Sequence, residues 1–136
     1  MIQAFVDRYM SSKDKIREGF RANWPGSYSD IVNAVVEAVK GEEYDTPSLD
    51  PVRITVIDDG DYQGTQLYII GTTGYQPSTY YSVYVQYGSC SGCDSLQAID
   101  PETDWDSDAY KKIITEENLD DVMMLALHIV QSLKEI

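Results

Sequence analysis

The sequence predicts an α+β domain in which helices cover one face of a three-stranded antiparallel meander. Apolar residues recur at helical spacing at both ends of the chain, over residues 2–40 and 118–134. Between them, residues 52–87 are rich in β-branched and aromatic residues, and short connections favour antiparallel pairing. A chain of 136 residues, 43% of them hydrophobic, is long enough for a single domain over 1–136. The expected order is α-α-β-β-β-α, with a further short helix before the last one.

Two helices are predicted before the first strand. An apolar stripe runs through residues 2–22, and the Trp-Pro-Gly sequence that follows should interrupt the helix. Ser27 is a good N-cap for a second helix, which should run to Lys40, where a glycine follows. The acidic segment 42–51 contains two prolines and predicts a loop.

Three strands are expected over residues 52–57, 65–72 and 78–87. An Asp-Asp-Gly-Asp sequence predicts a turn between the first two strands. In the third strand the odd-numbered residues are more apolar, so they should face the core. The even-numbered positions, with Tyr80 and Tyr84, should then face outward.

After the third strand, two more helices are predicted. Ser107 can cap a short helix over residues 108–114. Asn118 can cap a last helix that should run to about Lys134, with apolar residues at helical spacing along its buried face.

The charge of the chain is unevenly distributed. The formal net charge is −13, and residues 41–110 contain thirteen acidic side chains but only one basic side chain, Arg53. Such a surface repels nucleic acid and attracts basic proteins or cations, so direct nucleic-acid binding is not expected. Seven of the eleven tyrosines lie between residues 62 and 87. Tyrosine is enriched at protein interfaces, although it is also an ordinary component of half-exposed strands.

The composition argues against a membrane protein. No run of 18 apolar residues is present, and the first residues lack a basic region followed by an apolar stretch. A cytosolic protein is therefore expected. In that compartment, a pair of cysteines is more often reduced, metal-bound or redox-active than joined in a structural disulfide.

Both cysteines lie in one short segment, Cys90-Ser-Gly-Cys93. The C-x-x-C spacing allows two sulfurs to converge on one zinc ion, with His128 and Asp94 as further ligands, or with four cysteines supplied by a homodimer. A redox dithiol is a second interpretation, but the βαβ context that such chemistry uses is missing. A tight turn with two small thiols is the third interpretation.

No catalytic arrangement is evident in the sequence, so an enzyme is not expected. The single histidine forms no recognisable Ser-His-Asp or Cys-His pattern. Asp104, Asp106 and Asp108 match the first three ligand positions of an EF-hand loop, but Ala109 and Thr115 stand where Gly and Glu are required. A solvated acidic loop is the simpler interpretation.

Three short sequences resemble a group of small uncharacterised proteins of bacteriophages and prophages. They are Asp61-Tyr-Gln-Gly-Thr-Gln-Leu-Tyr68, Tyr75-Gln-Pro-Ser-Thr-Tyr80 and Tyr87-Gly-Ser-Cys-Ser-Gly-Cys-Asp-Ser-Leu-Gln97, and the last helix is similar too, at Ala126-Leu-His128. The resemblance implies a phage origin and hence the cytoplasm of a bacterial host. It implies no particular activity.

The charge and the tyrosines together predict an accessory protein that binds a host protein with a basic surface, and thereby inhibits a nucleic-acid-binding or defence protein. The residues expected to contact the partner are acids and exposed tyrosines: Asp58, Asp59, Asp61, Tyr80, Tyr84, Asp100, Glu102, Asp104 and Asp106. The alternative hypothesis is a zinc-stabilised structural module that uses the Cys90/Cys93 pair. No other cofactor is expected.

Overall fold

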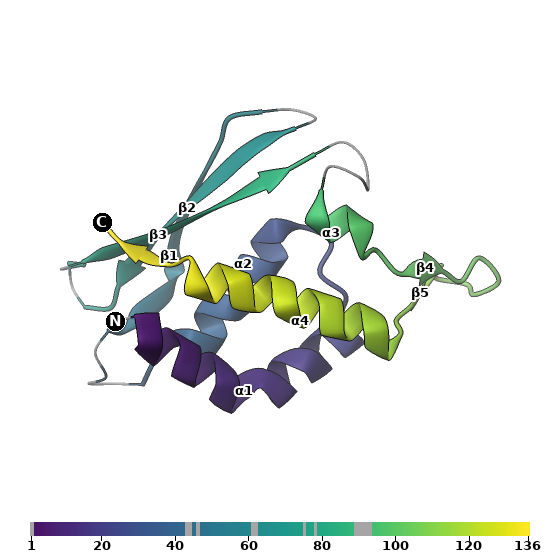
Figure 1. Cartoon of the computed structure of the whole chain (residues 1–136), viewed down its shortest axis with the longest axis horizontal. Helices are drawn as coiled ribbons and strands as arrows, with labels where there is room; N and C mark the ends of the chain where they lie inside the picture. The colour runs from purple at the N-terminus through teal and green to yellow at the C-terminus, as the bar shows by residue number, and fades with distance from the viewer. Residues whose placement is uncertain are drawn as a thin grey trace.

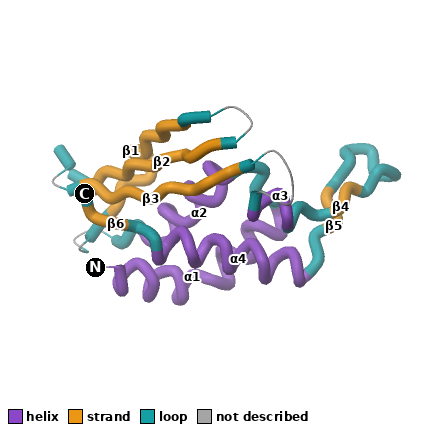
Figure 2. Tube along the Cα trace, turned by 45° about the horizontal axis from the view of Figure 1, so that its top comes forward, coloured by secondary structure: helices purple, strands orange, loops and turns teal. Residues whose placement is uncertain are grey.

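The computed structural model of the protein describes residues 2–42, 45, 47–60, 63–74, 76–77, 79–88 and 94–136. In this part of the chain, a sheet lies over a layer of helices, as Figures 1 and 2 both show. The helices are α1 (Ile2–Ala22), α2 (Tyr28–Val39), α3 (Ser95–Ala98) and α4 (Glu116–Gln131). The strands are β1 (Leu49–Asp58), β2 (Gly64–Thr72), β3 (Tyr80–Tyr87), β4 (Glu102–Thr103), β5 (Lys112–Ile113) and β6 (Lys134–Glu135).

The main sheet is antiparallel with strand order β1-β2-β3-β6, and β4 pairs with β5 in a separate hairpin. The predicted α+β class and the three-stranded meander are therefore confirmed. The sheet gains a short fourth strand, β6, because the end of the chain returns to pair with β3 at Tyr81 and Ser82. The last helix ends at Gln131, a few residues earlier than predicted, since residues 134–135 belong to this strand.

The helix ends follow ordinary capping chemistry. The Ser27 hydroxyl accepts the Asp30 N–H at 3.3 Å, and Gly41 has a positive φ of 79°, so α2 begins and ends as predicted. The last helix begins earlier than predicted. Thr115 is its N-cap, and Asn118 is the third helical residue, which completes a capping box with Thr115.

The first strand also begins earlier than predicted, within the segment 42–51 that was predicted to be a loop. Leu49 is buried, and it pairs with Thr72 across the sheet. The pairing register then shifts before Ile54, and the Arg53 side chain spans this irregular stretch by donating to the Thr72 and Gly74 carbonyls. Strand β1 is at the edge of the sheet, where proline is tolerated, so Pro51 does not prevent it.

The predicted short helix over 108–114 is wrong, because this segment forms a turn and strand β5. The Ser107 hydroxyl accepts the Lys111 N–H at 2.9 Å, and the Asp104 N–H donates to the Lys111 carbonyl at 2.7 Å. These bonds close a hairpin. Tyr110 has a φ of 47°, which a right-handed helix does not contain. The short helix of this region is α3, which Asp94 caps.

The core lies between the sheet and the helices. The odd-numbered residues Tyr81, Val83 and Val85 of β3 are buried there, as predicted, and the Phe5 ring of α1 meets Tyr81 edge to face at 5.1 Å between centroids. The largest fully buried side chains come from three helices, two strands and the segment after α4: Phe5, Ile31, Val32, Val35, Val36, Val39, Leu49, Tyr68, Ile70, Leu119, Val122 and Leu133.

Candidate protein-interaction site

The structure separates the residues that the sequence placed in a single site. Glu102, Asp104 and Asp106 belong to a hairpin that projects from the body, at the opposite end from the two chain termini (Figure 1), and Asp100 lies just before this hairpin. Tyr80 and Tyr84 lie instead on the main sheet, as do Asp58 and, in the turn after it, Asp59. Asp61 lies outside the described residues. We call the projecting hairpin, residues 102–113, the arm.

Local hydrogen bonds fix the shape of the arm. Glu102 pairs with Ile113, and Thr103 pairs with Lys112. Within the turn, the Asp104 carboxylate accepts the Asp106 N–H at 3.1 Å, and the backbone turn is closed by three further bonds. The tip is therefore preorganised, even though it makes little contact with the helical layer.

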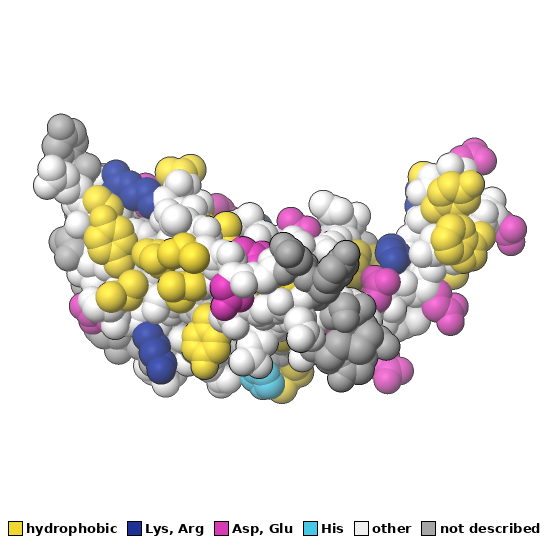
Figure 3. Space-filling model, turned by 90° about the horizontal axis from the view of Figure 1, so that it is seen from above, with side chains coloured by type: hydrophobic (Ala, Val, Ile, Leu, Met, Phe, Trp, Pro, Cys, Tyr) yellow, Lys and Arg dark blue, Asp and Glu magenta, His cyan; other side chains and the backbone are white. Residues whose placement is uncertain are grey.

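The end of the arm carries two exposed aromatic rings. The rings of Trp105 and Tyr110 lie 5.5 Å apart, and the two residues are 74% and 60% exposed. Figure 3 shows hydrophobic side chains gathered at the end of the arm with carboxylates beside them. Sequence reasoning did not single out either ring, although a tryptophan within the run of five carboxylates over residues 100–108 was an available signal. Exposed Trp and Tyr are the side chains most often used as anchors in protein interfaces.

The acids of the arm are not neutralised by the chain itself. Asp100, at the base of the arm, pairs with Lys112 at 3.1 Å. Within the described residues, the other acids of the arm form no ion pair: Glu102, Asp104, Asp106 and Asp108. These carboxylates share the arm with the two rings and make it both apolar and acidic.

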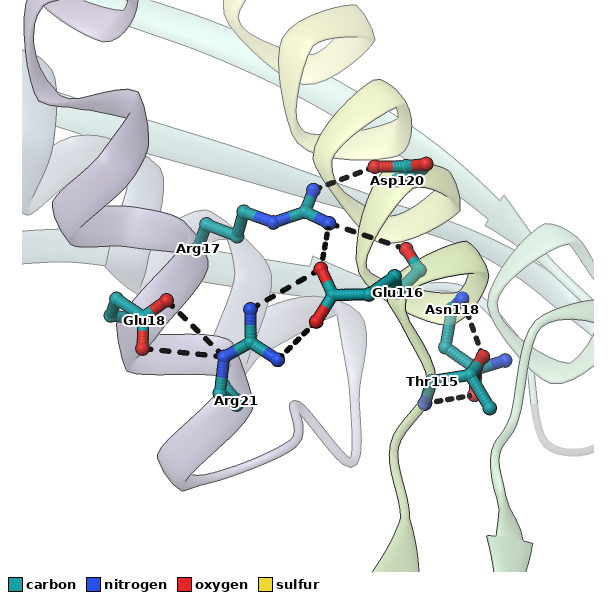
Figure 4. A network of polar contacts seen from close by, with 7 residues as sticks. All are labelled: Arg17, Glu18, Arg21, Thr115, Glu116, Asn118 and Asp120. Atoms are coloured by element: carbon teal, nitrogen blue, oxygen red, sulfur yellow. Dashed lines mark hydrogen bonds and ion pairs between the residues drawn. The ribbon is translucent and has the colours of Figure 1, made fainter.

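Many of the basic side chains, by contrast, form ion pairs within the chain. Arg17 and Arg21 of α1 share the carboxylate of Glu116 on α4, with shortest contacts of 2.7 and 2.5 Å, and Arg17 also binds Asp120 (Figure 4). These hydrogen bonds, first from Arg21 and then from Arg17, lower the pKa of Glu116 to about 2. Ion pairs also engage Lys40, Arg53 and Lys112. The field outside the molecule is therefore dominated by unpaired carboxylates.

The outer face of the main sheet carries the two predicted tyrosines. Tyr80 and Tyr84 are 45% and 62% exposed, which confirms their predicted outward orientation. Tyr84 lies opposite Leu67, and Leu67 lies opposite Ile57, so apolar side chains cross all three strands. Figure 3 shows hydrophobic side chains gathered over the sheet, away from the arm.

Asp58 and Asp59 stabilise the turn between β1 and β2 by accepting hydrogen bonds. The Asp58 carboxylate accepts hydrogen bonds from the Tyr87 hydroxyl, the Gly60 N–H and the Gln66 amide, and these bonds lower the pKa of Asp58. Asp59 accepts the Thr65 N–H at 2.6 Å. Both carboxylates therefore have a structural role at the positions where sequence reasoning expected contact with a partner.

The predicted metal ligands do not form a described cluster. Cys90 and Cys93 lie outside the described residues, and His128 is exposed on α4. Asp94 is buried, and its oxygens are used by the protein: it accepts the Gly88 N–H at 2.9 Å and the Tyr28 hydroxyl at 2.8 Å. The described residues contain no group of three or more His, Cys, Asp or Glu placed to hold a metal ion, and this includes the EF-hand-like acids of the arm.

Asp94 also caps α3 by accepting the Leu96 and Gln97 N–H groups. Burial alone would raise the pKa of Asp94, but the hydrogen bonds from Gly88, Tyr28 and α3 outweigh it, so the pKa lies below its ordinary value. The ionised carboxylate thus joins the end of β3, the start of α2 and the start of α3. Its role in this arrangement is structural.

Comparisons with known proteins add no family assignment. No family model, no curated protein and no solved structure matches the chain. Among the described helices, none combines the length and the apolar character needed to cross a membrane.

Proposed function

We propose that the protein acts by binding a partner protein with a basic surface, and that the arm makes the central contact. The observation that carries this proposal is the Trp105–Tyr110 ring pair, exposed on a preorganised turn in an arm whose own acids form no ion pair in the described chain. A turn that only stabilised the fold would not leave its two largest aromatic rings exposed to solvent. The positive φ of Tyr110 adds local strain, which is more common at functional sites than elsewhere.

The two features of the arm have different roles in such a contact. Burial of an aromatic anchor in a partner's pocket typically contributes about 2 kcal/mol or more to binding. The preorganised turn reduces the entropy lost on association. The carboxylates steer the encounter with a basic surface and fix its orientation, mainly through the association rate.

The resemblance to phage proteins supports a narrower form of the proposal. A small acidic phage protein can occupy a basic groove that otherwise binds nucleic acid, and so inhibit a host nucleic-acid-binding or defence protein. This action requires occupation of a surface and no covalent chemistry, so the protein is proposed to be a binding protein without a cofactor and not an enzyme.

Affinity capture from bacterial lysate, followed by measurement of the dissociation constant for each captured protein, tests this function. We expect captured partners with isoelectric points above about 9. Replacing both rings, Trp105→Ala with Tyr110→Ala, should weaken binding at least about tenfold, which corresponds to about 1.4 kcal/mol. Replacing the four unpaired arm acids by lysine should weaken it further and reduce its dependence on salt.

A matched variant controls for total charge. It replaces four exposed acids on the helices by lysine, Asp7, Asp14, Glu117 and Asp121, and leaves the arm intact. We expect its affinity to stay much closer to that of the unchanged protein. If the two sets of lysine substitutions weakened binding equally, only the net charge would matter. If the Trp105→Ala, Tyr110→Ala variant bound as tightly as the unchanged protein, the arm would be excluded as the contact.

A further inference from the structure

The β6 side of strand β3 is only partly paired. Strand β6 covers two residues near the start of β3, although β3 continues to Tyr87. Backbone groups alternate between the two edges of a strand, and the bond from the Ile136 N–H to the Tyr80 carbonyl shows that even-numbered residues of β3 face the β6 edge. Among the described residues, no strand pairs with this edge at Tyr84 and Gln86. Within the described part of the chain, two outward N–H groups and two carbonyls of β3 are therefore left without a strand partner.

A groove of about 540 Å³ lies beside this open stretch of edge. One wall is β3 from residue 82 to residue 86, and the other is α4, which contributes Leu125 and Ile129. Figure 2 shows β6 linking the end of α4 to the edge of the sheet. Lys134 of β6 and residues 82–86 of β3 both line the groove, so the groove lies next to β6 along this edge. An added strand would occupy this position, about 4.8 Å from β3.

Among the described residues that line the groove, none is acidic and one, Lys134, is a lysine. Apart from tyrosines, the titratable side chains that line it are His128 and Lys134. Lys134 pairs with Ser82, so both side chains lie on the same face of the sheet as Tyr84, whereas the neighbouring Glu135 lies on the other face. Charges more than about 8 Å away are largely screened at physiological salt. A carboxylate is therefore the complementary group at this end of the groove.

We propose that the groove binds an extended, acidic peptide segment of a partner protein as an additional antiparallel strand on β3. A peptide residue opposite Tyr84 follows Lys134 along the same edge of β3, and its side chain lies on the same face of the sheet. We therefore expect this residue to be acidic. The residue opposite Val85 points to the helical side and packs on Leu125 and Ile129, so this residue is apolar. The open backbone edge supplies the hydrogen bonds. This site is independent of the arm, and its ligand has the opposite charge.

Selection from a displayed library of random peptides against the full chain tests the proposal, followed by fluorescence anisotropy with the selected peptides. We expect the selected peptides to alternate apolar residues with Asp or Glu. Tyr84→Pro removes an outward N–H without touching the ladder to β2 and should weaken binding at least about tenfold. Lys134→Glu should weaken binding similarly, and a peptide with lysine in place of its acidic residue should regain affinity for that variant.

A matched control uses the opposite edge of the sheet. The Asp59 N–H donates to the Thr65 carbonyl of β2, so the backbone groups of even-numbered β1 residues point outward. Val56→Pro therefore also removes an outward N–H and leaves the ladder to β2 intact. Circular dichroism should show the same fold for both proline variants, and Val56→Pro should bind the peptides as the unchanged protein does. Trp105→Ala should also leave peptide binding unchanged, which separates this site from the proposed function of the arm.

Three outcomes would overturn the proposal: selection without enrichment, selected peptides that carry basic in place of acidic residues, or equal affinities for the Tyr84→Pro and Val56→Pro variants. If Tyr84→Pro fails to fold, the proposal is tested by the charge swap between Lys134→Glu and the lysine peptide. This experiment leaves the strand backbone unchanged. Absence of rescue in that experiment rejects the proposed orientation of the added strand.

Discussion

Asp94 shows how much a single buried carboxylate organises in this fold. It holds together three elements that are distant in sequence, through hydrogen bonds from Gly88 at the end of β3, from Tyr28 in α2 and from the first residues of α3. A buried charge is tolerated only when hydrogen bonds replace its lost hydration. The Cys90–Cys93 segment ends directly before this residue. Asp94 is thus held in place by the fold directly after that segment.

We predict that Asp94→Asn lowers the free energy of unfolding by about 2 kcal/mol, because an amide is a weaker acceptor and offers only one oxygen. The folded-state pKa of Asp94 is lowered, so its stabilisation is present above the unfolded value of about 4 and is lost as the pH falls through the folded value. Urea unfolding at neutral and acidic pH measures this: the difference between the two proteins should shrink in acid. Asp108→Asn, on the exposed arm, is the control and should change stability by less than about 0.5 kcal/mol. A loss in the Asp94 variant that stays constant with pH would contradict this assignment.

At the scale of elements, local signals in the sequence identified most of the framework. Ser27 specified the start of α2, and the alternation along β3 correctly separated the buried residues from Tyr80 and Tyr84. Local signals failed where the same residue is compatible with two local structures. The hydroxyl of Ser107 can cap a helix or close a hairpin, and its bond to the Lys111 N–H belongs to the second choice.

Non-local features were the least predictable. Strand β6 pairs only two residues with β3, and no alternation can be recognised in so short a segment. The division of the predicted site between sheet and arm likewise depends on where a hairpin points, which sequence spacing does not determine. Trp105 and Tyr110 were overlooked because the surrounding acids predicted only a solvated loop.

The N-terminus of α4 provides a prediction at the element scale. Thr115→Ala removes one half of the capping box with Asn118 and should lower the free energy of unfolding by about 1 kcal/mol. Thr115→Ser keeps a hydroxyl acceptor and should restore most of this loss. Thermal unfolding followed by circular dichroism measures both variants. If alanine and serine behaved alike, the capping box would not be contributing to stability.

At the scale of the whole molecule, the structure combines an acidic exterior with an arm at one end and an open sheet edge elsewhere. The zinc-stabilised module remains the alternative hypothesis for the Cys90/Cys93 pair. We expect less than about 0.1 zinc per chain in protein purified without chelator, because the Asp94 oxygens are already occupied by hydrogen bonds. Elemental analysis combined with native mass spectrometry measures zinc content and subunit number together. About one zinc per chain, or one per pair of chains, would favour the alternative, and chelation should then lower the thermal stability.

The contacts between α1 and α4 have a consequence for synthesis of the protein. Arg17 lies 99 and 103 residues before its partners Glu116 and Asp120. At elongation rates of about 5–20 residues per second, α4 is synthesised roughly 5–20 seconds after α1. Because Phe5 and Tyr9 are buried only in the finished fold, a nascent chain exposes them to the ribosome surface and to chaperones throughout that interval. Helices α1 and α4 can pack together only after α4 has left the exit tunnel.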